Sequence, residues 1–191
     1  MPFSEKKQAL RRQIRSRRQS IPLQDRLKAA VRLTDHLSAL AQSWPPQTIA
    51  GYHPMGSEID ITPAMIALEK AGHRMALPAI HDQTLQFRLI RLGDLLQDGP
   101  HTTFQPGPDR PLCRPKVLLV PLIAFDRTLN RLGQGAGYYD RAIASLRQEG
   151  EVQAIGIAYE CQRLEMLPAE PHDQKLDLVI TEDALYHPIT D

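Results

Sequence analysis

An apolar run, a glycine-rich turn and an amphipathic segment follow one another in this chain and constrain its fold more than any other feature. The run Val117–Ile123 reads V-L-L-V-P-L-I, and residues 130–141 read N-R-L-G-Q-G-A-G-Y-Y-D-R. Helical spacing then places four apolar side chains on one face: Tyr139, Ala142, Ile143 and Leu146. The order is therefore strand, connecting loop, glycine loop and helix, which is the building unit of an α/β protein.

The glycine block is predicted to bind an anion. Glycines let backbone N–H groups surround a phosphate, and the N-terminus of the following helix adds positive potential. A P-loop would need Gly-Lys followed by Ser or Thr, which is missing. A dinucleotide fold would need G-x-G-x-x-G directly after the strand, although Glu160 could still serve as its ribose-binding acid. A glycine turn without any ligand is the other alternative, and the nearby Arg131 and the Tyr-Tyr-Asp sequence disfavour it.

The block R-L-G-x-G-x-G-Y-Y-D-R, after an apolar strand ending V-P-x-x-A-F-D, resembles the 5-formyltetrahydrofolate cyclo-ligase family, also called 5,10-methenyltetrahydrofolate synthetases. The likeness extends from Lys-x-x-Leu-Arg near the N-terminus to L-D-L-V-I-T-E-D near the end. The resemblance implies ATP- and Mg²⁺-dependent closure of 5-formyltetrahydrofolate to 5,10-methenyltetrahydrofolate, through a phosphorylated formyl group. This chain has Ala136 where members place Lys or Gly, so Arg131, Lys7 and Arg11 would have to supply the positive charge.

The resemblance also implies an ATP site. Lys7 and Arg11 are four residues apart, so on a helix both point the same way and could hold one polyphosphate. The implied ATP-binding residues are Lys7, Arg11, Arg131, Leu132, Gly133, Gln134, Gly135, Ala136, Gly137, Tyr138 and Tyr139, and the implied catalytic residues are Arg131, Tyr138 and Asp140. One of the two tyrosine rings is expected to pack into the core, and the other faces the ligand.

A folate site is implied in the loop after the strand that ends at Tyr52. A family glutamate in a setting matching Glu58 contacts folate, and a carboxylate can accept paired N–H bonds from an aminopyrimidine. Otherwise Glu58 is an acid near the next helix N-terminus. His53 is a pocket residue or an ordinary strand-end residue. The full substrate-binding set is His53, Glu58, Gln134, Gly135, Ala136, Gly137 and Tyr138.

Two aspartates are the candidate Mg²⁺ ligands. Mg²⁺ keeps several waters, so one or two carboxylates and phosphate oxygens usually suffice. Asp140 follows the tyrosine pair, and the family counterpart of Asp173 lies four residues before the aspartate that opens the last strand. Without the resemblance, Asp140 could merely stabilise its helix N-terminus, and Asp173 could be a loop cap.

Composition favours a compact α/β domain covering residues 1–191. The chain is 42% hydrophobic and 24% charged. The net charge of +1 gives no strong field toward nucleic acid or a membrane. The two cysteines define no metal or disulfide pattern, which favours a reducing compartment. We therefore expect a cytoplasmic enzyme, acting as a monomer on small molecules.

The N-terminus, residues 1–20, is predicted to be a basic helix that contributes to the nucleotide site. Its arginines and lysines also suit a transit peptide, a nucleic-acid arm or a solvated helix face. Apart from Lys7 and Arg11, these basic residues are expected on the surface.

Strand-like and helix-like segments alternate along the chain. Helices are expected from Leu23 to near Ser43, from an N-cap at Thr62 to Gly72, and after the glycine block. The stretch 93–115 contains five prolines and is expected to be irregular. Strands are expected at 48–52, 75–77, 85–90, 117–123, 152–158 and 176–181. This alternation predicts a three-layer fold with a mostly parallel central sheet and helices on both faces.

Ligands of such sheets bind beyond the carboxyl ends of the strands. That rule selects the loop after Tyr52, the loop after Ile123 and the segment before Leu176 as one cleft. Two other functions stay open. A non-catalytic nucleotide- or folate-binding protein would bind without forming ADP, and a nucleic-acid binder would show strong, salt-dependent affinity for oligonucleotides.

Overall fold

An eight-stranded sheet forms the centre of the protein. The computed structural model describes residues 3–170 and 172–188. The sheet order is β13-β12-β10-β7-β1-β2-β3-β6. The inner strands are parallel: β12 (Leu178–Ile180), β10 (Gln153–Ile157), β7 (Val117–Pro121), β1 (Thr48–Ala50) and β2 (Arg74–His81). The flanking strands are antiparallel: β13 (Leu185–Tyr186), β3 (Thr84–Ile90) and β6 (Leu112–Cys113).

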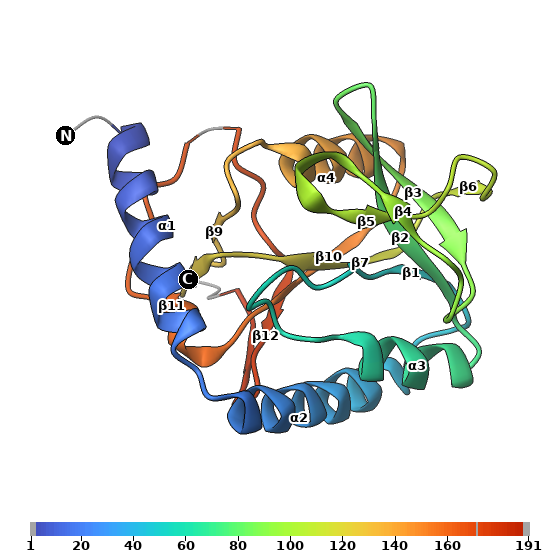
Figure 1. The fold of residues 1–191 in the computed structure, drawn as a ribbon, viewed down its shortest axis with the longest axis horizontal. Coiled ribbons are helices and arrows are strands. Elements are labelled where there is room, and N and C mark those ends of the chain that lie inside the picture. The colour runs from blue at the N-terminus through green and yellow to red at the C-terminus, as the bar shows by residue number, and fades with distance from the viewer. Residues whose placement is uncertain (1–2, 171, 189–191) are drawn as a thin grey trace.

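Helices cover both faces of the sheet (Figure 1). On one face lie α2 (Leu23–Ala41) and α3 (Thr62–Lys70), and on the other lies α4 (Tyr138–Glu149). Successive strand residues enter opposite cores, as the period of two requires: Leu119 packs with the α2 side, and Leu118 and Val120 pack with the α4 side. The predicted three-layer α/β class is confirmed.

The N-terminal helix α1 (Phe3–Gln19) stands at one end of the sheet. Ile14, which is fully buried, anchors it to a small cluster with Leu132 and Leu167. Residues 1–2 of the predicted basic helix lie outside the described residues. No helix in the described part of the chain is both long enough and apolar enough to cross a bilayer.

The connection between β7 and the glycine block is a small sheet instead of an irregular loop. Strands β8 (Ala124–Asp126) and β9 (Arg131–Leu132) form a hairpin, and β11 (Arg163–Leu164) pairs with β8. Asp126 closes the hairpin, since its carboxylate accepts the N–H groups of Thr128 and Asn130 at 3.0 and 3.1 Å. Strands of two or three residues are too short to produce a periodic pattern, which is why the sequence did not predict them.

Two further expectations are corrected. Thr62 is not the N-cap: α3 begins at Thr62, Ile61 precedes it, and the Asp60 carboxylate accepts the Thr62 N–H at 2.8 Å. The proline-rich stretch is not wholly irregular. It contains a short helix η1 (Pro100–Thr102), β6, and the paired strands β4 (Gln97–Asp98) and β5 (Phe104–Gln105). A second short helix, η2 (Glu160–Gln162), follows β10.

Candidate functional site

The glycine loop, residues 133–137, connects β9 to the N-terminus of α4. Gly135 has a φ of +115° and Gly137 a φ of +67°, conformations that L side chains rarely adopt. Within the described part of the chain, no backbone N–H of the glycine loop donates to a protein acceptor. No side chain caps α4 either. The loop therefore presents a group of free N–H donors next to a positive helix end.

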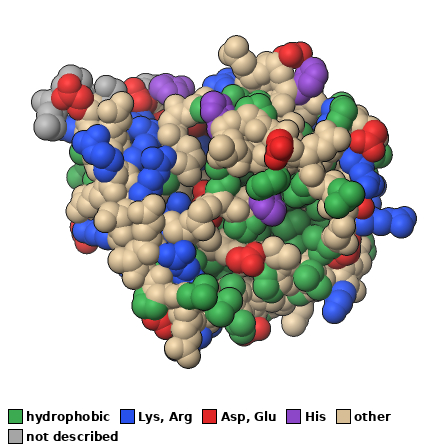
Figure 2. Space-filling view, viewed as in Figure 1, with side chains coloured by type: hydrophobic (Ala, Val, Ile, Leu, Met, Phe, Trp, Pro, Cys, Tyr) green, Lys and Arg blue, Asp and Glu red, His purple; other side chains and the backbone are tan. Residues whose placement is uncertain are grey.

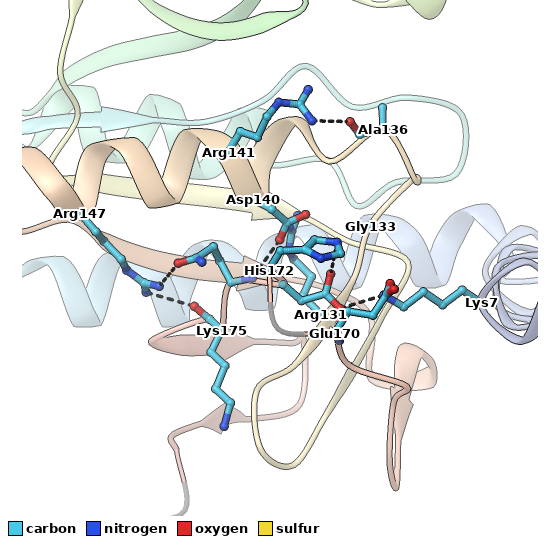
Figure 3. A network of polar contacts seen from close by, with 12 residues as sticks. Lys7, Arg131, Gly133, Ala136, Asp140, Arg141, Arg147, Glu170, His172 and Lys175 are labelled. Carbon is cyan, nitrogen blue, oxygen red and sulfur yellow. Dashed lines mark hydrogen bonds and ion pairs between the residues drawn. The ribbon is translucent and has the colours of Figure 1, made fainter. Parts of the chain in front are cut away.

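Arginines surround this loop. Arg11 donates its Nε–H to the Gly133 carbonyl at 2.9 Å, and Arg15 donates to the Gln134 side-chain oxygen. From the other side, Arg141 Nη1 donates to the Ala136 carbonyl at 3.0 Å (Figure 3). Thus Arg141 and Arg15 bring positive charge to the loop that lacks a lysine at Ala136. The sequence did not predict either arginine as a site residue, although Arg141 is the last residue of the glycine motif.

A buried ion pair lies directly beneath the loop. Arg131 Nη2 and Asp140 Oδ1 are 2.7 Å apart, and the exposed fractions of the two side chains are 3% and 20%. The same Asp140 oxygen accepts the Gln174 N–H at 3.1 Å, which ties α4 to the segment before β12. Among the described residues, three buried side-chain donors have no acceptor, and two of them lie here: Arg131 Nε and the Tyr139 hydroxyl. Burial of such donors is costly, so a site with several of them is suited to an oxygen-rich anion.

Lys7 bridges α1 to two carboxylates of the segment before β12 (Figure 3). Its Nζ lies 2.7 Å from Glu170 Oε2 and 2.8 Å from Asp173 Oδ2. Burial alone would lower the pKa of Lys7, but hydrogen bonds to Asp173 and Glu170 outweigh it and raise this pKa. Burial likewise opposes the effect of Lys7 on Asp173, whose pKa is nevertheless lowered. The pairs with Glu170 and Asp173 therefore hold Lys7 in its charged form.

The two predicted metal ligands are both paired with cations: Asp140 with Arg131, and Asp173 with Lys7. Asp173 also belongs to a set with Glu170 and His172 whose ligand atoms lie within 4.8 Å of one another. Sequence reasoning missed Glu170 and His172. In the sequence, only their closeness to Asp173 indicated that they belong to this cluster.

Glu58 reaches the glycine loop from the loop after β1. Its Oε1 accepts the Gln134 Nε2–H at 3.1 Å, and its Oε2 accepts the Met55 N–H at 3.1 Å. Burial raises the pKa of Glu58, and the Met55 N–H, Arg18 and Gln134 oppose that rise. The predicted meeting of this loop with the glycine block is therefore present in the structure.

Other predicted site residues have different surroundings. His53 is exposed, and its ring packs edge-on against Phe104 at 5.2 Å. The Tyr138 ring lies 6.2 Å from His101 of η1 and carries the Arg141 guanidinium over its face. Tyr139 instead packs against the core on the α4 side. Leu132 is buried, so only its backbone can face a ligand.

The three segments that the strand-end rule selected meet through two hydrogen bonds. Gln134 joins Glu58, and Gln174 joins Asp140. In Figure 2, hydrophobic side chains lie across the middle of one face, beside the basic residues over α1. A cavity of about 710 Å³ lies instead at the amino ends of the strands, lined by residues such as Lys116 and Val152. Its size alone does not make it the site, because none of the free donors described above lines it.

The surroundings of Arg18 and Glu160 differ from those that the sequence predicted. Arg18 is not on the surface: it is only 6% exposed and donates to the buried Ser57 hydroxyl. Glu160 accepts bonds from Tyr186 and Thr181, at 2.7 and 3.0 Å, so its carboxylate is already used in joining β13 and β12 to η2.

Fold and site together define an α/β protein in which a glycine loop with free N–H groups leads into helix α4. Residues 3–182 match the model of the 5-formyltetrahydrofolate cyclo-ligase family, and the chain belongs to that family. A relative named 5-formyltetrahydrofolate cyclo-ligase, from Escherichia coli, is 32% identical over 162 residues, which cover 75% of this chain and 85% of that protein.

Two solved structures extend the likeness. The 5,10-methenyltetrahydrofolate synthetase of Aquifex aeolicus superposes with a TM-score of 0.76 at 26% identity, covering 95% of this chain and 92% of that one. The enzyme of the same name from Mycoplasma pneumoniae gives a TM-score of 0.71 at 29% identity, covering 92% and 98%. Membership of the family supports cyclo-ligase activity in folate metabolism.

Proposed function

We propose that the chain converts 5-formyltetrahydrofolate to 5,10-methenyltetrahydrofolate, with ATP converted to ADP and phosphate. One observation carries this proposal beyond family membership. The glycine loop, with its free backbone donors, contacts Glu58 through Gln134, and two unpaired donors, Arg131 Nε and the Tyr139 hydroxyl, are buried next to it. Such donors suit phosphate oxygens, and the carboxylate suits an aminopyrimidine.

A formyl group on nitrogen is a poor electrophile, because the nitrogen donates electrons into the carbonyl. Transfer of the γ-phosphoryl group to the formyl oxygen makes that oxygen a leaving group. N10 then attacks the formyl carbon, phosphate departs, and N10 loses its proton to give the methenyl product. This chemistry needs placement and neutralisation of charge more than a protein nucleophile. We assign charge neutralisation to Arg131, Arg11, Lys7 and the loop amides, and substrate placement to Glu58.

The donor set fits a Mg²⁺ ion. Carboxylate oxygens are hard ligands, and Asp140 and Asp173 are linked through the Gln174 N–H. When bound, the ion would neutralise charge on the phosphate oxygens. Arg131 and Lys7 now form ion pairs with these two carboxylates. A ligand that brings phosphates would give the two cations new partners and release the carboxylates toward the ion.

We further propose that the protein works as a monomer in the cytoplasm. The free cysteines Cys113 and Cys161 suit a reducing compartment. The second candidate function is a binding protein without turnover, since a shared fold does not establish activity.

Purified protein with ATP, Mg²⁺ and 5-formyltetrahydrofolate tests these proposals. Formation of the methenyl product is followed by its absorbance, and ADP by a coupled assay. We expect ADP release that requires the folate, at one ADP per product formed. Binding of both ligands without ADP would favour the binding protein, and salt-dependent affinity for oligonucleotides would favour the nucleic-acid binder.

Replacing Glu58 with glutamine is expected to weaken folate binding while stabilising the fold at neutral pH. A raised carboxyl pKa means that the folded state binds this proton more readily than the unfolded state. The free energy of unfolding therefore falls as pH rises through the shifted pKa. The glutamine variant has no such proton and does not lose this stability. Urea unfolding across the acidic to neutral range should show the variant's advantage shrinking as pH falls. Equal stabilities at every pH would contradict a raised pKa.

A further inference from the structure

A buried arginine near the end of α1 lacks the partner that its charge requires. Arg18 is 6% exposed, and its Nε–H donates to the Ser57 hydroxyl at 2.9 Å. Among the described residues, its two Nη nitrogens donate to no acceptor. Arginine is rarely buried without a partner, because desolvating its charge is costly. The terminal guanidinium donors are therefore available to a ligand.

Arg18 lies near Glu58, the protein carboxylate proposed to bind folate. This position indicates which ligand group Arg18 meets. Its hydrogen-bond partner Ser57 directly precedes Glu58 in the chain, and the charges of Arg18 and Glu58 interact. The neighbouring Tyr52 hydroxyl is already used, since it donates to the Ile59 carbonyl at 3.0 Å. The Tyr159 hydroxyl also has no partner among the described residues, but Arg18 alone of these groups brings free donors with a positive charge.

Glu58 retains capacity to accept two more hydrogen bonds. Each carboxylate oxygen can accept about two, and each already accepts one, from Gln134 and from Met55. One acceptor position on each oxygen stays free. These positions match two adjacent N–H groups of a ligand, as in the 2-amino and N3–H groups of a pterin.

The edge of an oxo-pterin presents three groups in order: the 2-amino group, N3–H and the C4 oxygen. The first two donate and the third accepts. If the Glu58 carboxylate takes the two donors, the adjacent C4 oxygen needs a donor from the protein. A 4-amino-pteridine has another donor at that position, which a guanidinium cannot accept because it has no acceptor atom.

We propose that Arg18 determines specificity, by donating to the C4 oxygen of the folate and excluding 4-amino pteridines. This inference rests on the proposed function, because it places the pterin on Glu58. Ser57 acts as a positioning residue that holds the Arg18 Nε, which leaves the Nη groups directed to the ligand. The ligand class is thus a 2-amino-4-oxo-pteridine.

Calorimetric binding of two ligands without ATP tests the proposal: 5-formyltetrahydrofolate and its 4-amino-4-deoxy analogue. The wild-type protein should prefer the oxo ligand. Arg18→Met removes the donors and keeps an apolar stem, so binding of the oxo ligand should weaken roughly 10- to 100-fold. Binding of the amino analogue should be unchanged or tighter, so the preference between the two ligands should fall toward one.

Arg17→Met is the matched control, since Arg17 is the adjacent, exposed arginine of the same helix. It should keep the wild-type preference. Thermal unfolding checks that Arg18→Met is folded. If it is not, Ser57→Ala, which only releases the Arg18 Nε, takes its place and should reduce the preference to a smaller extent.

The outcomes separate the two proposals. A wild-type protein that binds neither reduced folate would overturn the proposed function. A wild-type protein that makes product, with a folded Arg18→Met or Ser57→Ala variant that keeps the full oxo preference, would overturn only the role of Arg18. Equal weakening of both ligands by Arg18→Met would also overturn it, because this would reflect damage to the pocket and not recognition of the C4 group.

Discussion

The Asp140→Asn variant is expected to lose about 10²- to 10³-fold in kcat, the loss typical when a preorganised charge is removed from a site. Asparagine keeps an acceptor for Arg131 but removes the negative charge that a hard cation requires. It also leaves the buried Arg131 guanidinium, 3% exposed, without its counter-charge. Because one acceptor remains, we expect a stability loss of about 1–3 kcal/mol, less than for a fully broken buried pair. Product formation at saturating substrates and urea unfolding measure the two effects.

Asp177→Asn is the matched control for that experiment. Asp177 is also an aspartate paired with an arginine, since Arg147 Nη2 lies 3.0 Å from its carboxylate, but it lines the cavity at the amino ends of the strands. Its pair is partly exposed, so its loss should cost about 1 kcal/mol or less. Turnover should stay normal. Normal turnover in Asp140→Asn as well would remove Asp140 from the proposed metal site.

Replacing Lys7 with methionine is expected to reduce kcat/KM for ATP by about 10²-fold, through loss of a cation from the phosphate site. Lys7 is also the shared counter-ion of Glu170 and Asp173, with distances of 2.7 and 2.8 Å. Removing it leaves two carboxylates close together without compensation. Both are partly exposed, so screening by solvent limits the stability loss to about 1–2 kcal/mol.

The pH dependence of stability distinguishes Lys7 from a surface lysine. Asp173 has a lowered pKa in the folded state, so between that value and its usual value the unfolded state binds more protons. The stabilisation is present above the usual pKa and is lost as pH falls through the folded one. The difference between wild type and Lys7→Met should therefore shrink in acid. Lys6→Met, at the exposed neighbouring position, should show neither effect, and a similar loss of ATP affinity there would contradict a specific role for Lys7.

Elements with an apolar run or strong periodicity could be predicted from the sequence, and short ones without either could not. The run at β7 and the amphipathic face of α4 contain enough residues to show their periods. The hairpin of β8 and β9 has strands of three and two residues, held by the Asp126 carboxylate through contacts across the turn. Such contacts depend on packing and leave no periodic signal.

The site divides in the same way. The glycine loop, Glu58, Asp140 and Asp173 could be named because their local motifs resemble those of a family. Arg18 and Glu170 could not, because nothing in the sequence around them distinguishes a site arginine or glutamate from a surface one. Their contacts with Ser57 and Lys7 join elements that only the fold brings together. Arg141 is the last residue of the glycine motif, but its bond to the Ala136 carbonyl is visible only in the structure.

The sequence alone determined the α/β class, the order of strands and helices, and a glycine turn able to surround an anion, because these follow from periodicity and from backbone freedom at glycine. Only the tertiary structure decided which charges meet. Lys7 lies 163 positions from Glu170 in the chain, and Gln134 lies 76 from Glu58. Interactions between charges depend on distance and burial in space, and both are set when the helices pack on the sheet.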